Sequence, residues 1–501
     1  MSTIRKQSII SSVIVYFGFA LGLFNTYLFT REGGFTEEQY GLTGTFIAFA
    51  NIMFSVAGLA MPGYIAKFFP YYKAHLSDRE NDQLSWALLL PCFGFLVVML
   101  LGLGFKNILI DKIFNNSPEL LQFYYWTFPF GFGYTIFMVL ESYAWQQRRA
   151  VLSNFLKEVL FRLIVTVLIV LTTLQLIRNF SEFIHLYALA YIALVLVMLF
   201  IFYRSRQLHF RFSASRVTRR FYRKIVALVI FVWGGGLVFN IASVFDTIII
   251  AAVLPNGMRA LAPFLLAQNI SSLMQAPQRA VISAAVGPLS QSWKEKDLSK
   301  IGRIYQRSSI NQLIFSSALF CLIWLNFDDA ISSFHLQSGY MQARQVFFFL
   351  GIAKIIDMGT GLNAQIIGTS TFWRFEFTSG LILLALTLPL NWELTRYMGI
   401  LGPAISNLIS FSIYNLIRYL FLWRKFRMQP FTPATIYTLV LAFICYMVSF
   451  WLLRREQGFL WITVRSLLFC ITFGIGLVGL KLSPDLQPVL LTIKKRIWRK
   501  G

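Results

Sequence analysis

The chain has 501 residues, of which 57% are hydrophobic and only 13% are charged. The charged share is about half that of a typical soluble globular protein, so a water-soluble fold is excluded. The formal charge of +24 does not indicate nucleic-acid binding, because lysine and arginine collect in alternate loops between apolar stretches. In that position they contact anionic lipid headgroups.

Apolar stretches of about 20 residues recur along the chain, and each is long enough to cross the hydrocarbon core as an α-helix. The alternating segments of about ten residues that a transmembrane β-barrel requires are missing. We therefore predict an all-α multi-pass membrane protein with about fourteen spans. The predicted spans are 8–29, 40–66, 84–105, 119–144, 159–177, 182–203, 225–254, 260–286, 303–325, 341–367, 374–392, 399–422, 434–453 and 460–481.

The distribution of lysine and arginine predicts that both termini face the cytoplasm. With the N-terminus inside, the cytoplasmic loops hold about thirty cations and the outer loops about eight. Both termini on one side require an even number of spans. The expected location is the cell inner (plasma) membrane.

The two halves of the chain resemble each other. Residues 13–18 in the first span resemble residues 229–234 in the seventh, 216 positions later. Asn51 has a counterpart in Asn269, 218 positions later, and a proline follows each asparagine after nineteen residues. This pattern indicates two six-helix lobes repeated in parallel around a central cavity near the membrane midplane. The predicted parts are a lobe at 1–203, a basic cytoplasmic linker at 204–224, a lobe at 225–423, two additional helices within 434–481 and a basic cytoplasmic tail at 482–501.

Polar side chains follow one face of the eighth span, beside Asn269. They recur every three or four residues, at Gln268, Ser272, Gln275, Arg279 and Ser283. Pro277 interrupts this helix and frees a backbone carbonyl. The face either lines a cavity that attracts anions through Arg279, or forms a helix contact held by polar side chains.

Other ionisable side chains within spans are candidates because a charge in hydrocarbon is costly unless it faces a cavity or a partner. Lys354 and Asp357 share one face of the tenth span. They form either an internal ion pair or a site whose protonation or cation occupancy changes during transport. Asp246 on the seventh span is similar, or else simply reaches water. Arg418, about one turn from the cytoplasmic end of the twelfth span, fits either a site or an anchor.

Further polar side chains have a structural alternative. Asn51 lies on a face of small residues that either packs against another helix or forms a cavity wall with room for a bulky headgroup. Glu141, Arg162 and Arg465 lie near the ends of their spans, where we expect them to reach the headgroups as anchors.

The sequence contains no Walker A loop, no GxSxG motif and no HExxH motif, and its four histidines are far apart. The longest predicted outer loops, 106–118 and 326–340, are short for a membrane glycosyltransferase. The four cysteines are widely spaced within apolar spans, which favours free thiols. We therefore expect no enzymatic activity and no cofactor, with Na⁺ or H⁺ as the candidate coupling ion.

Three stretches resemble the second-lobe signature of polysaccharide-biosynthesis flippases. They are residues 245–250 (FDTIII), 267–270 (AQNI) and 287–290 (GPLS). These flippases belong to the multidrug, oligosaccharidyl-lipid and polysaccharide exporter (MOP) superfamily. The resemblance in layout covers nearly the whole chain, from the basic N-terminus through two six-span lobes to two extra C-terminal spans.

The resemblance implies a transporter that flips a polyprenyl-diphosphate-linked oligosaccharide, a repeat unit of O-antigen, capsule or exopolysaccharide, to the periplasmic leaflet by alternating access. Arg279 and Lys354 would attract the diphosphate, and Asp246 or Asp357 would couple to a cation. Polysaccharide polymerase machinery is an expected partner, together with anionic lipids.

Related flippases of peptidoglycan precursors carry an arginine where this chain has Asn269, which argues against a muropeptide substrate. Two other readings stay open: a multidrug or cation antiporter of the same superfamily, and a membrane enzyme acting on polyprenyl-linked sugars.

Overall fold

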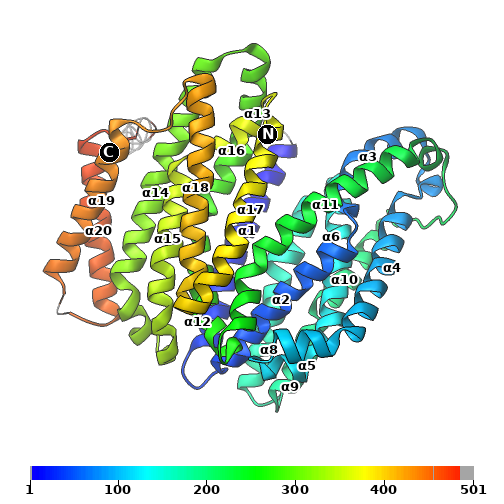
Figure 1. The fold of residues 1–501 in the computed structure, drawn as a ribbon, viewed down its shortest axis with the longest axis horizontal. Helices are drawn as coiled ribbons and strands as arrows, with labels where there is room; N and C mark the ends of the chain where they lie inside the picture. Colours follow the sequence, from blue (N-terminus) through cyan, green and yellow to red (C-terminus); the bar gives the residue numbers. More distant parts are fainter. Residues whose placement is uncertain (1–2, 455, 484, 486–501) are drawn as a thin grey trace, which may run out of the picture. The chain divides into compact units, whose positions relative to one another are not determined.

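The fold is described from a computed structural model, within residues 3–454, 456–483 and 485 (Figure 1). These residues form helices and connecting loops, and no strand occurs among them. The predicted all-α class is therefore confirmed. The chain divides into two compact units, Met1–Ala262 and Pro263–Gly501, each with its own packing.

The first unit is built around α6, which packs against α2, α3, α4 and α10. Gly133 allows α6 and α10 to approach closely, because a Cβ atom there would lie 2.6 Å from the backbone nitrogen of Ile192. The helices of this unit are α1 (Thr3–Thr30), α2 (Glu37–Ala57), α3 (Met61–His75), η1 (Asp78–Glu80), α4 (Gln83–Gly104), η2 (Ile108–Ile113), α5 (Pro118–Phe123), η3 (Tyr124–Trp126), α6 (Thr127–Gln146), α7 (Ala150–Asn154), η4 (Phe155–Leu160), α8 (Phe161–Thr173), α9 (Phe180–Ala188), α10 (Ala190–Arg204), α11 (Arg216–Val253) and the start of α12 (Gly257–Leu273).

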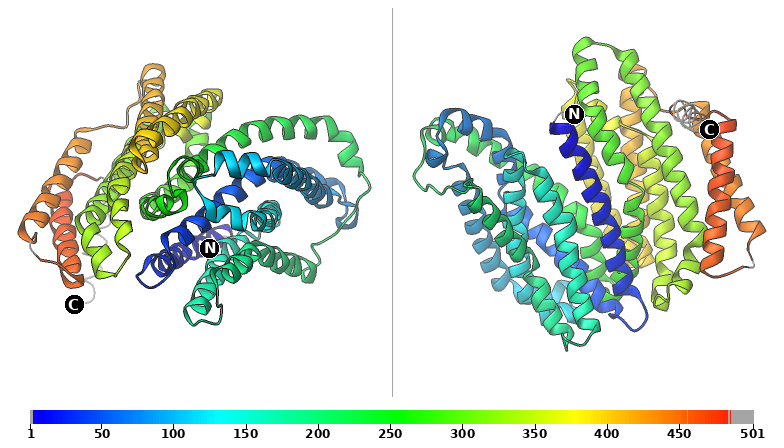
Figure 2. Two further views of the ribbon diagram at one scale, coloured as in Figure 1. Left: turned by 60° about the horizontal axis from the view of Figure 1, so that its bottom comes forward. Right: turned by 180° about the vertical axis from the view of Figure 1, so that it is seen from behind.

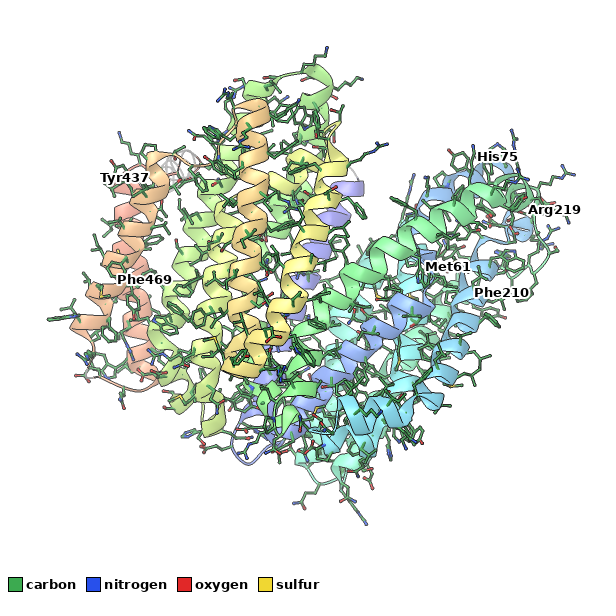
Figure 3. The ribbon with its side chains drawn as sticks, viewed as in Figure 1. Met61, His75, Phe210, Arg219, Tyr437 and Phe469 are labelled. Carbon is green, nitrogen blue, oxygen red and sulfur yellow. The ribbon has the colours of Figure 1, made fainter. Side chains whose placement is uncertain are left out.

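The second unit has two apolar clusters. One joins α13, α14, α16 and α18 around Tyr305 and Ile366. The other joins α14 to the hairpin of α19 and α20 around Phe469, labelled in Figure 3. The helices of this unit are the remainder of α12, α13 (Ala276–Glu295), α14 (Leu298–Ser333), η5 (Ser338–Gln342), α15 (Ala343–Gly359), α16 (Asn363–Gly368), α17 (Trp373–Met398), α18 (Leu401–Phe426), α19 (Pro433–Leu452) and α20 (Phe459–Gly479).

Ten helical segments in the described residues are long and apolar enough to cross a membrane. They coincide with ten of the fourteen predicted spans, which shows a multi-pass membrane protein, and the count of fourteen stays a prediction. The other four predicted spans correspond to α6 and to three runs of shorter helices: η4 with α8, α12 with α13, and α15 with α16. Interrupted helices within a membrane are found where protein or a cavity satisfies the freed backbone groups.

The second predicted span is broken in the same way as the eighth. The chain turns at residues 58–60, where Leu59 and Ala60 have positive φ angles, and α3 begins at Met61 (Figure 3). In the eighth span, α13 begins at Ala276, 215 positions after Met61, with Pro277 in its first turn. The two breaks therefore fall at nearly equivalent positions of the proposed repeat.

The predicted basic linker is only partly a loop, because α11 begins at Arg216. Its first turn is held by Asp82, which is fully buried. Asp82 Oδ2 accepts hydrogen bonds from the backbone nitrogen of Ser215 at 2.9 Å, Oγ1 of Thr218 at 2.7 Å and Nε1 of Trp86 at 3.2 Å. Thr218 also bonds to Tyr72, and burial raises the pKa of that phenol.

All three predicted headgroup anchors form ion pairs, and the anchor prediction was wrong for Glu141 and Arg465, which are buried in the protein. Glu141 is 3% exposed, and its carboxylate lies 3.0 Å from Nζ of Lys157. Arg162, in the first turn of α8, pairs with Glu158 at 2.8 Å. Glu158 lies in the π-helical turn η4, which packs against α1 (Figure 2). Sequence position alone does not show this, because the Glu141–Lys157 contact joins different helices.

Arg465 on α20, also predicted as a headgroup anchor, is 6% exposed and pairs with Asp329 on α14. The outer loop predicted at 326–340 is also shorter than expected, because α14 continues to Ser333 and η5 begins at Ser338. Acidic residues in this last turn lower its hydropathy, yet the ion pair keeps it helical.

Candidate functional site

The break between α15 and α16 creates the most polar buried region of the second unit. Gly361 has a φ of +67°, which favours glycine. A Cβ atom there would also lie close to α14, 3.0 Å from Oγ of Ser308. The carbonyl of Gly359 accepts a hydrogen bond from Ser309. The freed backbone is thus satisfied by α14, and the side chains that flank the break are turned toward α18.

Asn415 on α18 is 1% exposed and connects these side chains. Its Oδ1 accepts from Oγ1 of Thr360 at 2.9 Å and from Nδ2 of Asn363 at 2.9 Å. Its Nδ2 donates to Oδ1 of Asp357 at 3.2 Å. On the other carboxylate oxygen, Asp357 accepts from Nε2 of Gln278 at 3.2 Å. These five residues form what we call the Asp357 network, which links α13, α15, α16 and α18.

A second polar group lies about one turn further along α18. Arg418, 4% exposed, donates to Glu376 on α17 and to the phenol oxygen of Tyr414. The guanidinium carbon also lies 3.6 Å from the centre of the Tyr414 ring. Arg418 lies eight residues before the end of α18, about two helical turns, whereas the sequence predicted about one turn. Its charge is held by a carboxylate, as expected of an ion buried in a membrane.

Several predicted site residues lie near the Asp357 network in the chain. Lys354, one turn before Asp357, is half-buried, and its Nζ lies 5.6 Å from the centre of the Phe411 ring on α18. Arg279, which follows Gln278 directly, is exposed.

The polar face predicted for the eighth span is not one continuous face, because the helix is broken at residues 274–275. Gln268 and Asn269 lie on α12, half-buried and exposed respectively, while Gln275 caps α13. The side chain of Ser283 lies outside the described residues. Breaking the helix redirects α13, which is how Gln278 reaches Asp357.

The other two candidates lie in the first unit. Asn51 on α2 accepts a hydrogen bond from Oη of Tyr134 at 3.0 Å and donates to the carbonyl of Ile47. Asp246 on α11 is 7% exposed, so its side chain is largely covered by protein.

Gln278, Asn415, Tyr414 and Glu376 were not predicted. A signal for α18 was present, since polar side chains recur every fourth residue at Ser406, Ser410, Tyr414 and Arg418. All four are buried, as a polar stripe facing the interior requires. No group of three or more histidine, cysteine or acidic residues suited to a metal occurs in the described part of the chain, and the four cysteines are free thiols.

Chemically, the second unit offers one carboxylate with two amide donors, several further amides and a hydroxyl, and cations on neighbouring turns. A carboxylate that accepts two hydrogen bonds can exchange them for contacts to a small cation. Amides, hydroxyls and aromatic rings are groups that bind sugars, and lysine and arginine bind phosphates.

Solved structures with a similar fold are transporters. The lipid II flippase MurJ in an inward closed conformation matches with a TM-score of 0.73 and 14% identity, covering 93% of this chain and 98% of that chain. An inward-facing multidrug resistance MATE family transporter of the MOP superfamily matches with a TM-score of 0.60 and 14% identity, covering 84% and 94%. The Vibrio cholerae MATE transporter VcmN in the bent form gives 0.52 and 14%, covering 85% and 98%.

No family model and no curated protein matches the sequence. The evidence therefore lies in the three-dimensional arrangement, and it agrees with the resemblance noted in the sequence. The chain has the same fold as these MurJ and MATE structures.

Proposed function

We propose that this protein flips a polyprenyl-diphosphate-linked oligosaccharide from the cytoplasmic to the periplasmic leaflet of the inner membrane by alternating access. The observation that carries the proposal is the extent of the match. The match to MurJ covers 93% of this chain. The match to the MATE transporter covers 84% of this chain, even though it includes 94% of that transporter's length. The difference is about the share of the chain that the α19–α20 hairpin occupies. The chain is thus built to the length of a lipid flippase.

The polar groups of the second unit support a substrate that carries both sugar and phosphate. Amides and hydroxyls from α13, α15, α16 and α18 converge within a membrane-embedded bundle. Lys354 and Arg279 lie on the turns next to this network and supply positive charge for a diphosphate. Asn269 and Gln275 flank the break in the eighth span, where freed backbone groups add further polarity.

Asp357 is the group best placed to couple transport to an ion. As a carboxylate, it accepts from Gln278 on α13 and from Asn415 on α18, so it links two helices. Protonation would turn one oxygen into a hydroxyl, which is a poorer acceptor for an amide nitrogen than a carboxylate oxygen, and the link would weaken. A bound Na⁺ would compete for the same oxygens. Asp246, buried on α11, is the second candidate.

One alternative has an observation in its favour, because MATE transporters share the fold. A drug or cation antiporter would also use a membrane-embedded carboxylate. The additional C-terminal hairpin and the amide-rich network favour the lipid-linked sugar over a planar drug cation.

A reconstituted flipping experiment tests the proposal. Purified protein in liposomes is given a fluorescent polyprenyl-diphosphate oligosaccharide, and a membrane-impermeant quencher measures its transfer between leaflets. We expect transfer by the wild-type protein and at least about a tenfold loss for Arg279→Ala and Lys354→Gln, since a charged hydrogen bond to phosphate contributes about 1.5–3 kcal/mol.

The matched control is Lys294→Gln, which removes a cation near the cytoplasmic end of α13 and leaves the network intact. We expect its flipping rate to equal that of the wild type. Ethidium efflux without lipid transfer would replace the proposal with the antiporter. Hydrolysis or elongation of the lipid-linked sugar would replace it with an enzyme.

A further inference from the structure

A lipid-facing groove in the first unit has no part in the proposed transport site. Its walls are Ile14 of α1, Val151 and Leu152 of α7, Phe155 of η4 and Ile201 of α10. Arg148 and Arg149, in the turn between α6 and α7, complete the lining. The hollow is shallow and open, with a volume of about 520 Å³.

The groove combines two chemistries. Five aliphatic or aromatic side chains provide a surface for hydrocarbon, and two adjacent guanidinium groups provide positive charge at the same hollow. Charge counting places the α6–α7 turn at the cytoplasmic face, where the acyl chains and headgroups of the inner leaflet meet. Phosphate and guanidinium are complementary in charge and in hydrogen-bonding geometry.

The turn that carries the arginines is held in place by the backbone. Arg148 has a φ of +59°, a conformation that favours glycine, and the nitrogen of Arg149 donates to the carbonyl of Ala144 at 2.8 Å. Trp145 is 52% exposed, and its Nε1 donates to Oγ of Ser153 at 2.9 Å. A tryptophan with one polar contact and an open ring is typical of the headgroup level.

We propose that this groove binds an anionic phospholipid of the cytoplasmic leaflet, with the phosphate on Arg148 and Arg149 and an acyl chain along Leu152, Phe155 and Ile201. The site lies entirely within the first unit, and the proposal does not depend on the transported substrate. A loosely held annular lipid would need only an apolar surface, whereas the paired arginines select for negative charge.

The test is native mass spectrometry of the full chain, purified in a mild detergent and titrated with phosphatidylglycerol or phosphatidylethanolamine. We expect phosphatidylglycerol to bind in preference, and its affinity to fall about fivefold for each arginine replaced in Arg148→Gln and Arg149→Gln. Leu152→Trp fills the apolar part without changing charge, and we expect it also to lower the occupancy.

The matched control is the double variant Arg219→Gln with Arg220→Gln, which removes two exposed arginines from the start of α11. We expect it to bind phosphatidylglycerol within about twofold of the wild type. An equal loss in this control, unchanged binding in Leu152→Trp, or retention of a polyprenyl-diphosphate lipid in place of the phospholipid would overturn the assignment. Monodisperse elution of each variant shows that it is folded.

Discussion

Asn415 is the residue on which the Asp357 network depends, because its side-chain amide is hydrogen-bonded to three other members, Thr360, Asn363 and Asp357. Its amide both accepts from the α15–α16 break and donates to the carboxylate. An amide is suited to this position since it carries a donor and an acceptor without charge. The side chain therefore sets the geometry of the carboxylate that we propose as the coupling group.

Replacing Asn415 with alanine should impair transport more than it impairs folding. Three hydrogen bonds of about 1 kcal/mol each are lost, and Asp357 keeps only Gln278. We expect at least a tenfold loss of flipping in liposomes and a changed dependence of the rate on pH or Na⁺.

Ser410→Ala provides the matched control on the same helix. Ser410 is fully buried, and its hydroxyl oxygen has no hydrogen-bond partner in the described residues. Its loss should leave transport unchanged. Equal effects of the two substitutions would mean that α18 responds to any change of buried polarity, and the coupling role would be lost.

The sequence singled out individual charged residues within the spans but not their partners. Lys354, Asp357 and Arg418 were identified because a charge within a span is conspicuous. Asn415 and Gln278 were not, since neutral amides hardly alter hydropathy. Helix packing decides which residue a side chain contacts. The sequence therefore does not show that Glu141 lies beside Lys157.

At the scale of elements, buried acids fasten helices that hydropathy alone would leave loosely joined. Asp82, in the turn before α4, holds the first turn of α11 through Ser215 and Thr218. The contact joins residues more than 130 positions apart in the sequence. It fixes where the long helix begins, and hence which of its residues enter the membrane.

Asp82→Ala should lower stability markedly. Three donors lose their acceptor, and unsatisfied buried donors cost about 1–3 kcal/mol each, so we expect the free energy of unfolding to fall by about 3 kcal/mol or more. Thermal unfolding in detergent, followed by tryptophan fluorescence, measures the change.

Glu80→Ala removes an exposed carboxylate from the preceding helical turn and serves as the comparison. Its melting temperature should match that of the wild type. If Asp82→Ala melted at the same temperature as Glu80→Ala, the anchoring of α11 would have to come from apolar contacts alone.

Helix breaks were predicted only where a proline marked them. Pro277 indicated the interruption before α13, whereas residues 40–66 were predicted as one continuous helix although Pro62 has the same place in the first turn of α3. The break after Gly359 has no proline beside it and was not predicted. Apolar residues in a left-handed conformation leave no trace in a hydropathy profile.

For the whole molecule, the open question is topology. Ten helical segments in the described residues are long and apolar enough to span the membrane. The other four predicted spans correspond to α6 and to three pairs of shorter helices. Broken helices can still cross the membrane in two pieces. If all four of these spans cross the membrane, the number of crossings is even and both termini lie on the same side, which the lysine and arginine count predicts to be the cytoplasm.

Cysteine labelling in intact cells decides the matter. In a background without the four native cysteines, a membrane-impermeant maleimide should label Glu32→Cys and Gln457→Cys from outside. Arg79→Cys and Gln429→Cys should react only after the membrane is permeabilised. All four positions are exposed. Labelling of Gln429→Cys from outside would contradict an even number of crossings.

The overall fold was the part most accessible from sequence. Span length, alternating loop charge and a repeated motif sufficed to predict an all-α transporter-like architecture, and the MurJ and MATE structures agree with it. Substrate identity is less accessible, because it depends on a few side chains placed by helix breaks.

The ion pair between Asp329 and Arg465 has a consequence for biosynthesis. The ribosome makes α14 long before α20, so the acid is delivered to the bilayer while its counter-charge has yet to be translated. During that interval the nascent chain carries an uncompensated carboxylate at the edge of the hydrocarbon, which is costly. A premature stop codon before α20 would make this condition permanent and mark the product for membrane proteases.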